Sequence, residues 1–143
     1  SLDSGAVAID VLDDRPCEFP RLDDRRLGHP FRNFHAAAKD PAVPAGFGVW
    51  NALVRYDLET GAVAERRAGR LALGEAIFAP RRHADPADEN AGYLLVYASD
   101  ADTLETTLLI LDPAHIDDEP VATLRLPQRI PLGLHGTWIP DRL

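Results

Sequence analysis

The chain has no methionine and only one cysteine, Cys17, among its 143 residues. A single thiol cannot form an intrachain disulfide, so we expect a reducing compartment and assign the protein to the cytoplasm. No apolar run approaches the roughly 18 residues that a membrane-spanning helix needs. We therefore expect no transmembrane segment.

Basic residues are also scarce. There are 15 lysines and arginines against 23 aspartates and glutamates, which gives a formal net charge of −8. Such a surface repels the phosphate backbone, so we expect no nucleic-acid partner. Hydrophobic residues make up 45% of the chain and charged residues 27%, which is typical of a globular protein. No linker divides the sequence, so we treat residues 1–143 as part of one domain.

Short segments rich in β-forming residues dominate the sequence, and turn residues separate them. The expected strands are residues 6–11, 49–58, 62–67, 76–78, 93–98, 106–112 and 121–126. No segment shows sustained helical periodicity, although residues 32–39 are expected to form one or two helical turns before Pro41. The sequence therefore predicts an all-β chain.

Three stretches of the sequence repeat one another. Each begins with small residues and leads to a side chain that can act as a metal ligand or support one. The starting stretches are residues 5–8, 61–64 and 120–122, and they lead to Glu18, Glu75 and His135. Glu75 follows Glu18 by 57 residues, and His135 follows Glu75 by 60. A period of this size fits one blade of a β-propeller.

If each repeat is one blade, Glu18, Glu75 and His135 project toward a common axis. Carboxylates and imidazoles around an axis are what a metal site needs, because a carboxylate can orient a ligating histidine. The alternatives are a packed His135, a Glu75 exposed at a strand end, and a loop carboxylate at Glu18, paired with Arg21. Because the chain begins inside a repeat, we also expect upstream blades to be missing.

Four motifs carry a resemblance to a known family. They are Glu-Phe-Pro-Arg at residues 18–21, Gly-Glu-Ala-Ile-Phe-Ala-Pro-Arg at 74–81, Gly-Tyr-Leu-Leu at 92–95 and Leu-Gly-Leu-His-Gly-Thr-Trp at 132–138. In order and spacing, the chain resembles the C-terminal portion of the carotenoid cleavage oxygenases. That family includes apocarotenoid oxygenases, lignostilbene dioxygenases and the retinal-pigment-epithelium isomerase.

The resemblance implies the C-terminal blades of a seven-bladed β-propeller with non-haem Fe(II) on its axis. In the family, four histidines bind the iron, and glutamates support three of them. His135 matches the last iron ligand, Glu75 the glutamate that supports it, and Glu18 a glutamate that supports another ligand. The other three ligands match no position of this chain, so we expect these 143 residues alone to be inactive.

The implied activity is oxidative cleavage of a conjugated carbon–carbon double bond by dioxygen, in a carotenoid, an apocarotenoid or a stilbene. Candidates for lining an apolar tunnel, with core packing as their alternative, are Phe47, Trp50 and Trp138. Four histidines match no ligand and lie in loop-like contexts, where we expect surface or packing roles: His29, His35, His83 and His115.

Two other functions compete with this interpretation. The first is a non-catalytic propeller remnant that serves as a binding or assembly surface, because propellers host many functions. The second is a small zinc hydrolase, which is weaker because no two histidines stand at ligand spacing.

Overall fold

The computed structural model describes residues 3–44, 46, 49–133 and 135–140. These residues form nine strands and one short 3₁₀ helix, and none of them is in an α-helix. The elements are β1 (Cys17–Arg21), η1 (Asp24–Arg26), β2 (Asn33–Ala38), β3 (Ala52–Asp57), β4 (Val63–Arg67), β5 (Leu71–Leu73), β6 (Ile77–Pro80), β7 (Gly92–Asp100), β8 (Thr106–Leu111) and β9 (Ala122–Arg125). The all-β prediction is confirmed.

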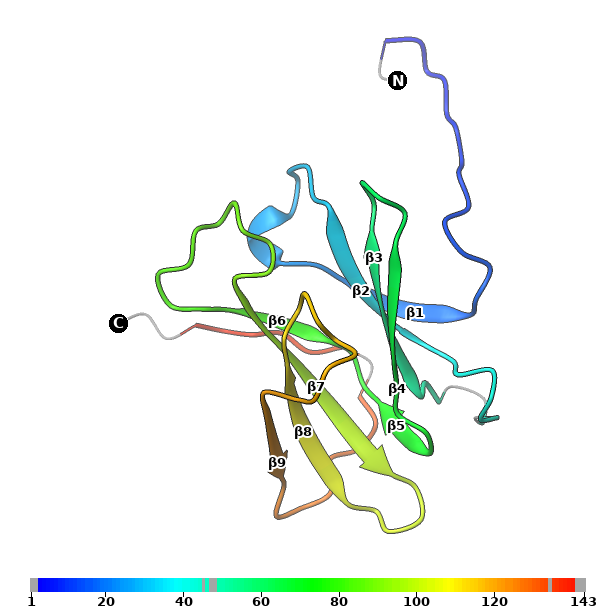
Figure 1. The fold of residues 1–143 in the computed structure, drawn as a ribbon, viewed down its shortest axis with the longest axis vertical. Coiled ribbons are helices and arrows are strands. Elements are labelled where there is room, and N and C mark those ends of the chain that lie inside the picture. Colours follow the sequence, from blue (N-terminus) through cyan, green and yellow to red (C-terminus); the bar gives the residue numbers. More distant parts are fainter. Residues whose placement is uncertain (1–2, 45, 47–48, 134, 141–143) are drawn as a thin grey trace.

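The strands form two antiparallel sheets (Figure 1). The first sheet has the order β1-β2-β3-β4, and the second has the order β5-β7-β8-β9. Strand β6 also pairs with β7, so β5 and β6 together act as one interrupted edge strand. Each sheet is thus a meander whose strands pair in chain order. The described residues do not close into a ring.

The expected strands at residues 49–58 and 62–67, and those at residues 106–112 and 121–126, form two hairpins. Strands β3 and β4 pair across a tight turn, and β8 pairs with β9 across a longer loop. In the tight turn, Asp57 Oδ1 accepts the backbone N–H groups of Glu59 and Thr60. Gly61 has a φ of 72°, a left-handed conformation that glycine adopts without strain. These local preferences explain why the turn could be read from the sequence.

The main core lies between the two sheets. Leu53 of the first sheet belongs to a buried cluster with residues of the second sheet: Leu73, Ala76, Phe78, Leu94, Val96, Ala98, Leu109, Leu111 and Ile116. Burying one aliphatic side chain of the size of leucine or valine contributes about 1.5–3 kcal/mol to the free energy of folding. A β-bridge between Trp50 and Leu73 also joins the sheets. The seam between the sheets is therefore a close-packed interface.

The predicted helical turn at residues 32–39 is wrong. Residues 33–38 form strand β2, which pairs with β1 on one side and β3 on the other. Ala36, Ala37 and Ala38 are at most 1% exposed. Alanine favours helices in isolation, but pairing on both sides and burial on both faces outweigh that preference.

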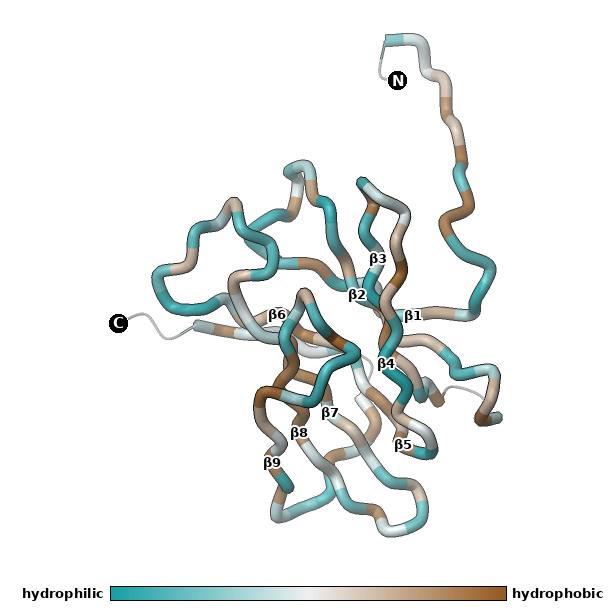
Figure 2. The backbone as a smooth tube through the Cα atoms, viewed as in Figure 1, coloured by the Kyte–Doolittle hydropathy of each residue, from teal (hydrophilic) through white to brown (hydrophobic). Residues whose placement is uncertain are grey.

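The predicted strand at residues 6–11 is absent from the structure, whereas β1, β2 and β5 were not predicted. Residues 3–12 extend away from both sheets as an irregular segment (Figure 1), whereas Asp13 and Arg15 contact Tyr56 and Glu65 of the first sheet. Figure 2 shows hydrophobic residues along this segment, and Val7, Ile9 and Val11 are between 82% and 87% exposed. An alternating pattern does not form a strand where no neighbouring strand lies beside it. Within the described residues, no helix has the length and apolar character needed to cross a membrane.

Candidate metal centre

Glu75 lies in the interruption between β5 and β6. Leu73 pairs with Ala98 and Ile77 pairs with Leu95, so four residue steps on the edge strand lie opposite three on β7. The edge strand therefore contains one extra residue. Gly74 N donates to Tyr97 O at 2.9 Å and holds the interruption against β7. Such a bulge re-aims the side chain that follows it. The carboxylate of Glu75 is buried, with 4% of its side chain exposed.

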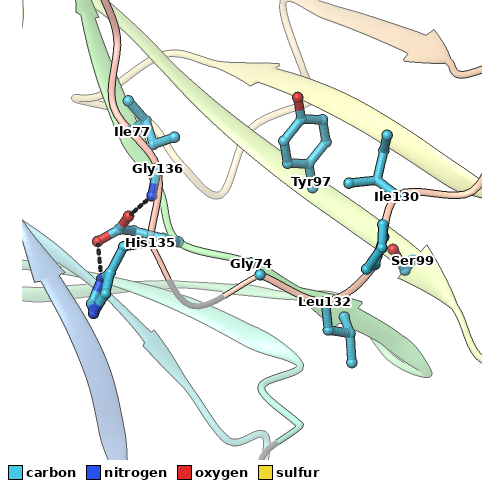
Figure 3. Close-up of a pocket in the computed structure, with 11 residues that line it drawn as sticks. Gly74, Ile77, Tyr97, Ser99, Ile130, Leu132, His135 and Gly136 are labelled. Atoms are coloured by element: carbon cyan, nitrogen blue, oxygen red, sulfur yellow. Dashed lines mark hydrogen bonds and ion pairs between the residues drawn. The ribbon is translucent and has the colours of Figure 1, made fainter.

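His135 lies on the C-terminal segment, and this segment contacts Glu75 through His135 and through Gly136 (Figure 3). His135 Nδ1 is 3.3 Å from Glu75 Oε1, and Gly136 N donates to Glu75 Oε2 at 2.7 Å. A Cβ at Gly136 would lie 2.5 Å from Ile77 Cδ1, so glycine permits this close approach. The predicted contact between the imidazole and its carboxylate is therefore present.

The arrangement leaves one ring nitrogen of His135 available. A carboxylate facing Nδ1 favours the proton on that atom, so Nε2 keeps a free lone pair. The side chain is 72% exposed, and the pair borders a pocket of about 200 Å³. Other residues lining the pocket are Gly74, Ile77, Tyr97, Ser99, Ile130 and Leu132 (Figure 3). An exposed imidazole nitrogen with a buried carboxylate behind it fits one ligand of a transition metal.

One imidazole does not make a complete metal site. Among the described residues, no three or more His, Cys, Asp or Glu side chains are grouped so as to hold an ion. A stable site needs further donors. The described residues fit one position of a histidine ligand set.

Two residues of the first sheet reach the pair from β1. The Phe19 ring stands edge-on to the imidazole, with centroids 5.5 Å apart and an interplanar angle of 86°. Arg21 Nη1 is 3.5 Å from Glu75 Oε1. Sequence reasoning missed this contact and offered Arg21 as a partner of Glu18; the structure instead pairs Arg21 with Glu75 and Asp24.

Glu18 occupies the matching place in the first sheet. Three residue steps from Glu18 to Arg21 face two from Ala37 to His35, so β1 has the same one-residue excess as the strand at Glu75. The side chain of Glu18 is exposed, and no hydrogen bond or ion pair joins it to another described residue. The matching position agrees with the sequence repeat, whereas the role of Glu18 stays a prediction.

His35 does not lie in a loop, as was expected, but in β2, where it is 4% exposed. Its Nε2 lies 3.0 Å from Pro113 O in the loop after β8. Burial, together with the nearby Arg55 guanidinium, lowers the pKa of His35 to about 4, although the bond to Pro113 opposes the shift. His35 is a packing residue between the sheets. Three other histidines are exposed, as expected: His29, His83 and His115.

The three tunnel candidates have different surroundings. Trp50 is half-buried, packs edge-on against Phe19 with centroids 6.5 Å apart, and carries the Lys39 ammonium 5.6 Å above its ring. Trp138 is 44% exposed and lines a groove on the second sheet. Phe47 lies outside the described residues. Trp50 is therefore connected with His135 through the ring of Phe19.

Comparison with known proteins shows the family of the chain. The family model described as RPE65, retinal pigment epithelial membrane protein, matches residues 1–140. The chain is 34% identical over 143 residues to a carotenoid cleavage oxygenase of Mycobacterium tuberculosis, covering 98% of this chain and 28% of the relative. It is 32% identical over 129 residues to a lignostilbene-α,β-dioxygenase of Sphingomonas paucimobilis, covering 85% of this chain and 26% of the relative.

Among solved structures, the cobalt-substituted apocarotenoid oxygenase of Synechocystis matches with a TM-score of 0.82 and 33% identity, covering 92% of this chain and 27% of the enzyme. The fold is thus that of an oxygenase family whose solved structures include a metal-substituted enzyme. The chain belongs to the RPE65, or carotenoid oxygenase, family. It spans about a quarter of the length of the curated relatives it matches.

Proposed function

We propose that this chain is the C-terminal part of a non-haem Fe(II) dioxygenase. The enzyme cleaves a conjugated carbon–carbon double bond of a carotenoid, an apocarotenoid or a stilbene. The observation that supports this most directly is the contact between His135 Nδ1 and the buried carboxylate of Glu75, which leaves Nε2 available to a metal. The oxygenase names of the relatives support the reaction class.

In this proposal each site residue has one task. His135 supplies one imidazole nitrogen to Fe(II), and the bound iron supplies the capacity to activate dioxygen. Glu75 accepts from Nδ1 and from the N–H of Gly136, so it fixes both the ring and the backbone that bears it. Glu18 supports a further histidine that lies outside this chain.

The proposed assembly is a seven-bladed propeller in the cytoplasm. The two sheets are two of its blades, and the preceding blades bring the other three histidines and close the ring. Phe19 lies beside His135 and Trp50 lies beside Phe19, and in this proposal their rings exclude water and offer an apolar surface to a polyene or a stilbene. The whole activity therefore depends on sequence beyond these 143 residues.

Metal analysis of the full-length protein tests the proposal. His135→Ala should lose bound iron and turnover together, because it removes a ligand. His115→Ala is the matched control, since this histidine is exposed in a loop away from the described contacts of Glu75. Wild-type iron content and turnover in His135→Ala would refute the assignment.

A further inference from the structure

The strand β1 contains a bulge that changes the direction of Arg21. Between Glu18 and Arg21 the strand has one residue more than the facing stretch of β2, from Ala37 to His35. Inside the bulge, Phe19 has a φ of 55°, a left-handed conformation that is uncommon for a large side chain. A strained conformation of this kind persists only where the surrounding structure holds it.

The extra residue determines the face on which Arg21 lies, because side chains alternate along a strand and directly paired residues share a face. Without it, Arg21 would pair with Phe34, whose ring stacks on Tyr56 at a centroid distance of 4.8 Å. With it, Arg21 pairs with His35, whose ring contacts Pro113 beyond the seam. The bulge therefore turns Arg21 toward the second sheet.

There, Arg21 contacts the same carboxylate oxygen as the imidazole. Arg21 Nη1 lies 3.5 Å and His135 Nδ1 lies 3.3 Å from Glu75 Oε1, while Gly136 N occupies Oε2. The other end of the guanidinium contacts both carboxylate oxygens of Asp24 at 3.3 Å. The cation is thus held at two ends, with 22% of its side chain exposed.

We propose that Arg21 is a positioning residue that acts on His135 through Glu75. The proposal rests on the proposed function, in which His135 is a metal ligand. A buried carboxylate that is ion-paired with a guanidinium and hydrogen-bonded to a backbone N–H and an imidazole cannot rotate freely, so the direction of the imidazole is fixed. The positive charge of Arg21 also lies beside Oε1 and partly offsets its negative charge. Arg21 thereby limits how strongly Glu75 polarises the His135 ring.

The test uses the full-length protein loaded with Co²⁺, whose visible absorption reports the ligand geometry. Arg21→Met keeps the unbranched apolar part of the side chain and removes the guanidinium and its charge. We expect it to weaken Co²⁺ affinity by about tenfold or more, the scale for groups that orient a ligand, and to change the spectrum. Arg21→Lys restores a cation and should recover part of the affinity.

Arg66→Met is the matched control. Arg66 also crosses the seam between the sheets, where it donates to Ile116 O at 3.3 Å and to Asp118 O at 2.7 Å, but it contacts none of the site residues described above. Its loss should lower the melting temperature and leave Co²⁺ affinity and the spectrum unchanged. The comparison separates a role in holding the sheets together from a role in positioning the carboxylate.

Wild-type Co²⁺ affinity and an unchanged spectrum in Arg21→Met would overturn the proposal. If Arg21→Met does not fold, Arg21→Gln replaces it with the same expectation and the same contrary result. His135→Ala, measured in parallel, separates the two proposals. If His135→Ala loses Co²⁺ while Arg21→Met keeps it, only the role of Arg21 fails; if His135→Ala keeps Co²⁺, the proposed function fails first.

Discussion

At the scale of single residues, Glu75 performs several tasks with one buried carboxylate. It accepts from the backbone of Gly136 and faces the imidazole of His135 and the guanidinium of Arg21. Both of its oxygens are used. A side chain with only one acceptor oxygen cannot reproduce this arrangement.

Glu75→Gln therefore should weaken metal binding in the full-length protein. The amide keeps the shape of the side chain, but its NH₂ group must face either Gly136 N or His135 Nδ1, so one hydrogen bond is lost. We expect metal affinity to fall by about 10–100-fold, measured by competition with a chelator. Glu59→Gln, whose side chain is 69% exposed, should bind metal like the wild type. Equal affinities in the two variants would contradict the role given to Glu75.

His35 predicts a dependence of stability on pH. Its pKa is lowered to about 4 in the folded state from an ordinary value of 6.5, because the ring is buried beside Arg55. Between these two values the unfolded chain binds more protons, so stability falls as the pH falls from 6.5 toward 4. Well above pH 6.5 the ring is neutral in both states and contributes nothing to the dependence.

The expected loss from His35 is about 2 kcal/mol between pH 7 and pH 5. Chemical unfolding of wild type and His35→Gln at the two pH values measures it. Glutamine retains an N–H group for the carbonyl of Pro113 and does not titrate. The variant should lose about 2 kcal/mol less than the wild type over this interval, and identical losses would show that His35 is not the responsible group.

At the scale of strands, Gly92 allows β6 and β7 to pair closely. It faces Pro80 at the start of β7, and a Cβ there would lie 2.6 Å from Ala79 O and closer still to the Phe78 ring. Backbone cannot move away as a flexible side chain can. Gly92→Ala should therefore destabilise the protein by about 1–3 kcal/mol in denaturant unfolding.

Gly133→Ala is the control for the substitution at Gly92. A Cβ at Gly133 would meet no atom within 4 Å, so little loss of stability is expected. If Gly92→Ala were as stable as Gly133→Ala, the pairing of β6 with β7 at this point would be wrong.

The strands that could be predicted are those whose signals are local. The strands of the β3–β4 hairpin were expected, and the turn between them has its local signals in Asp57 and Gly61. Strand β2 was missed because three consecutive alanines carry no strand preference of their own, and only its two neighbouring strands make it extended. Strand β5 is only three residues long, too short for a pattern to show.

Part of the candidate site was also predicted from the sequence, and part of it was not. The repeat placed Glu75 and His135 at matching positions, and the structure brings them within 3.3 Å. Arg21 was not connected with Glu75, because the bulge that turns it depends on the register between β1 and β2. A shift of one residue exchanges the two faces of a strand, and nothing in the local sequence marks it.

At the scale of the whole molecule, the two faces of the second sheet differ. One packs against the first sheet through the core cluster that contains Leu53. The other opens into a groove lined by apolar side chains, among them Leu95, Ile110 and Trp138. Val121 on the same groove is 59% exposed. In the proposed propeller, a neighbouring blade covers this face, which explains why the sheet is apolar on both sides.

The N-terminal segment provides the sharpest test of that assembly. Residues 5–8 repeat residues 61–64, which include the start of β4, the outer strand of the first sheet. The proposal therefore makes residues 7–11 the outer strand of a preceding blade, where Ile9 becomes buried. In the full-length protein, Ile9→Asp should lower stability by about 2 kcal/mol or more, because a carboxylate then replaces a buried aliphatic group.

The control is Asp10→Asn, a polar change beside Ile9 that should shift stability by less than about 0.5 kcal/mol. Amide hydrogen exchange gives a second measurement, since the N–H groups of residues 7–11 should be protected when they pair with a neighbouring strand. Rapid exchange at these residues, together with an unchanged melting temperature in Ile9→Asp, would mean that the segment joins no blade. The propeller arrangement proposed here would then be wrong, even if His135 bound metal.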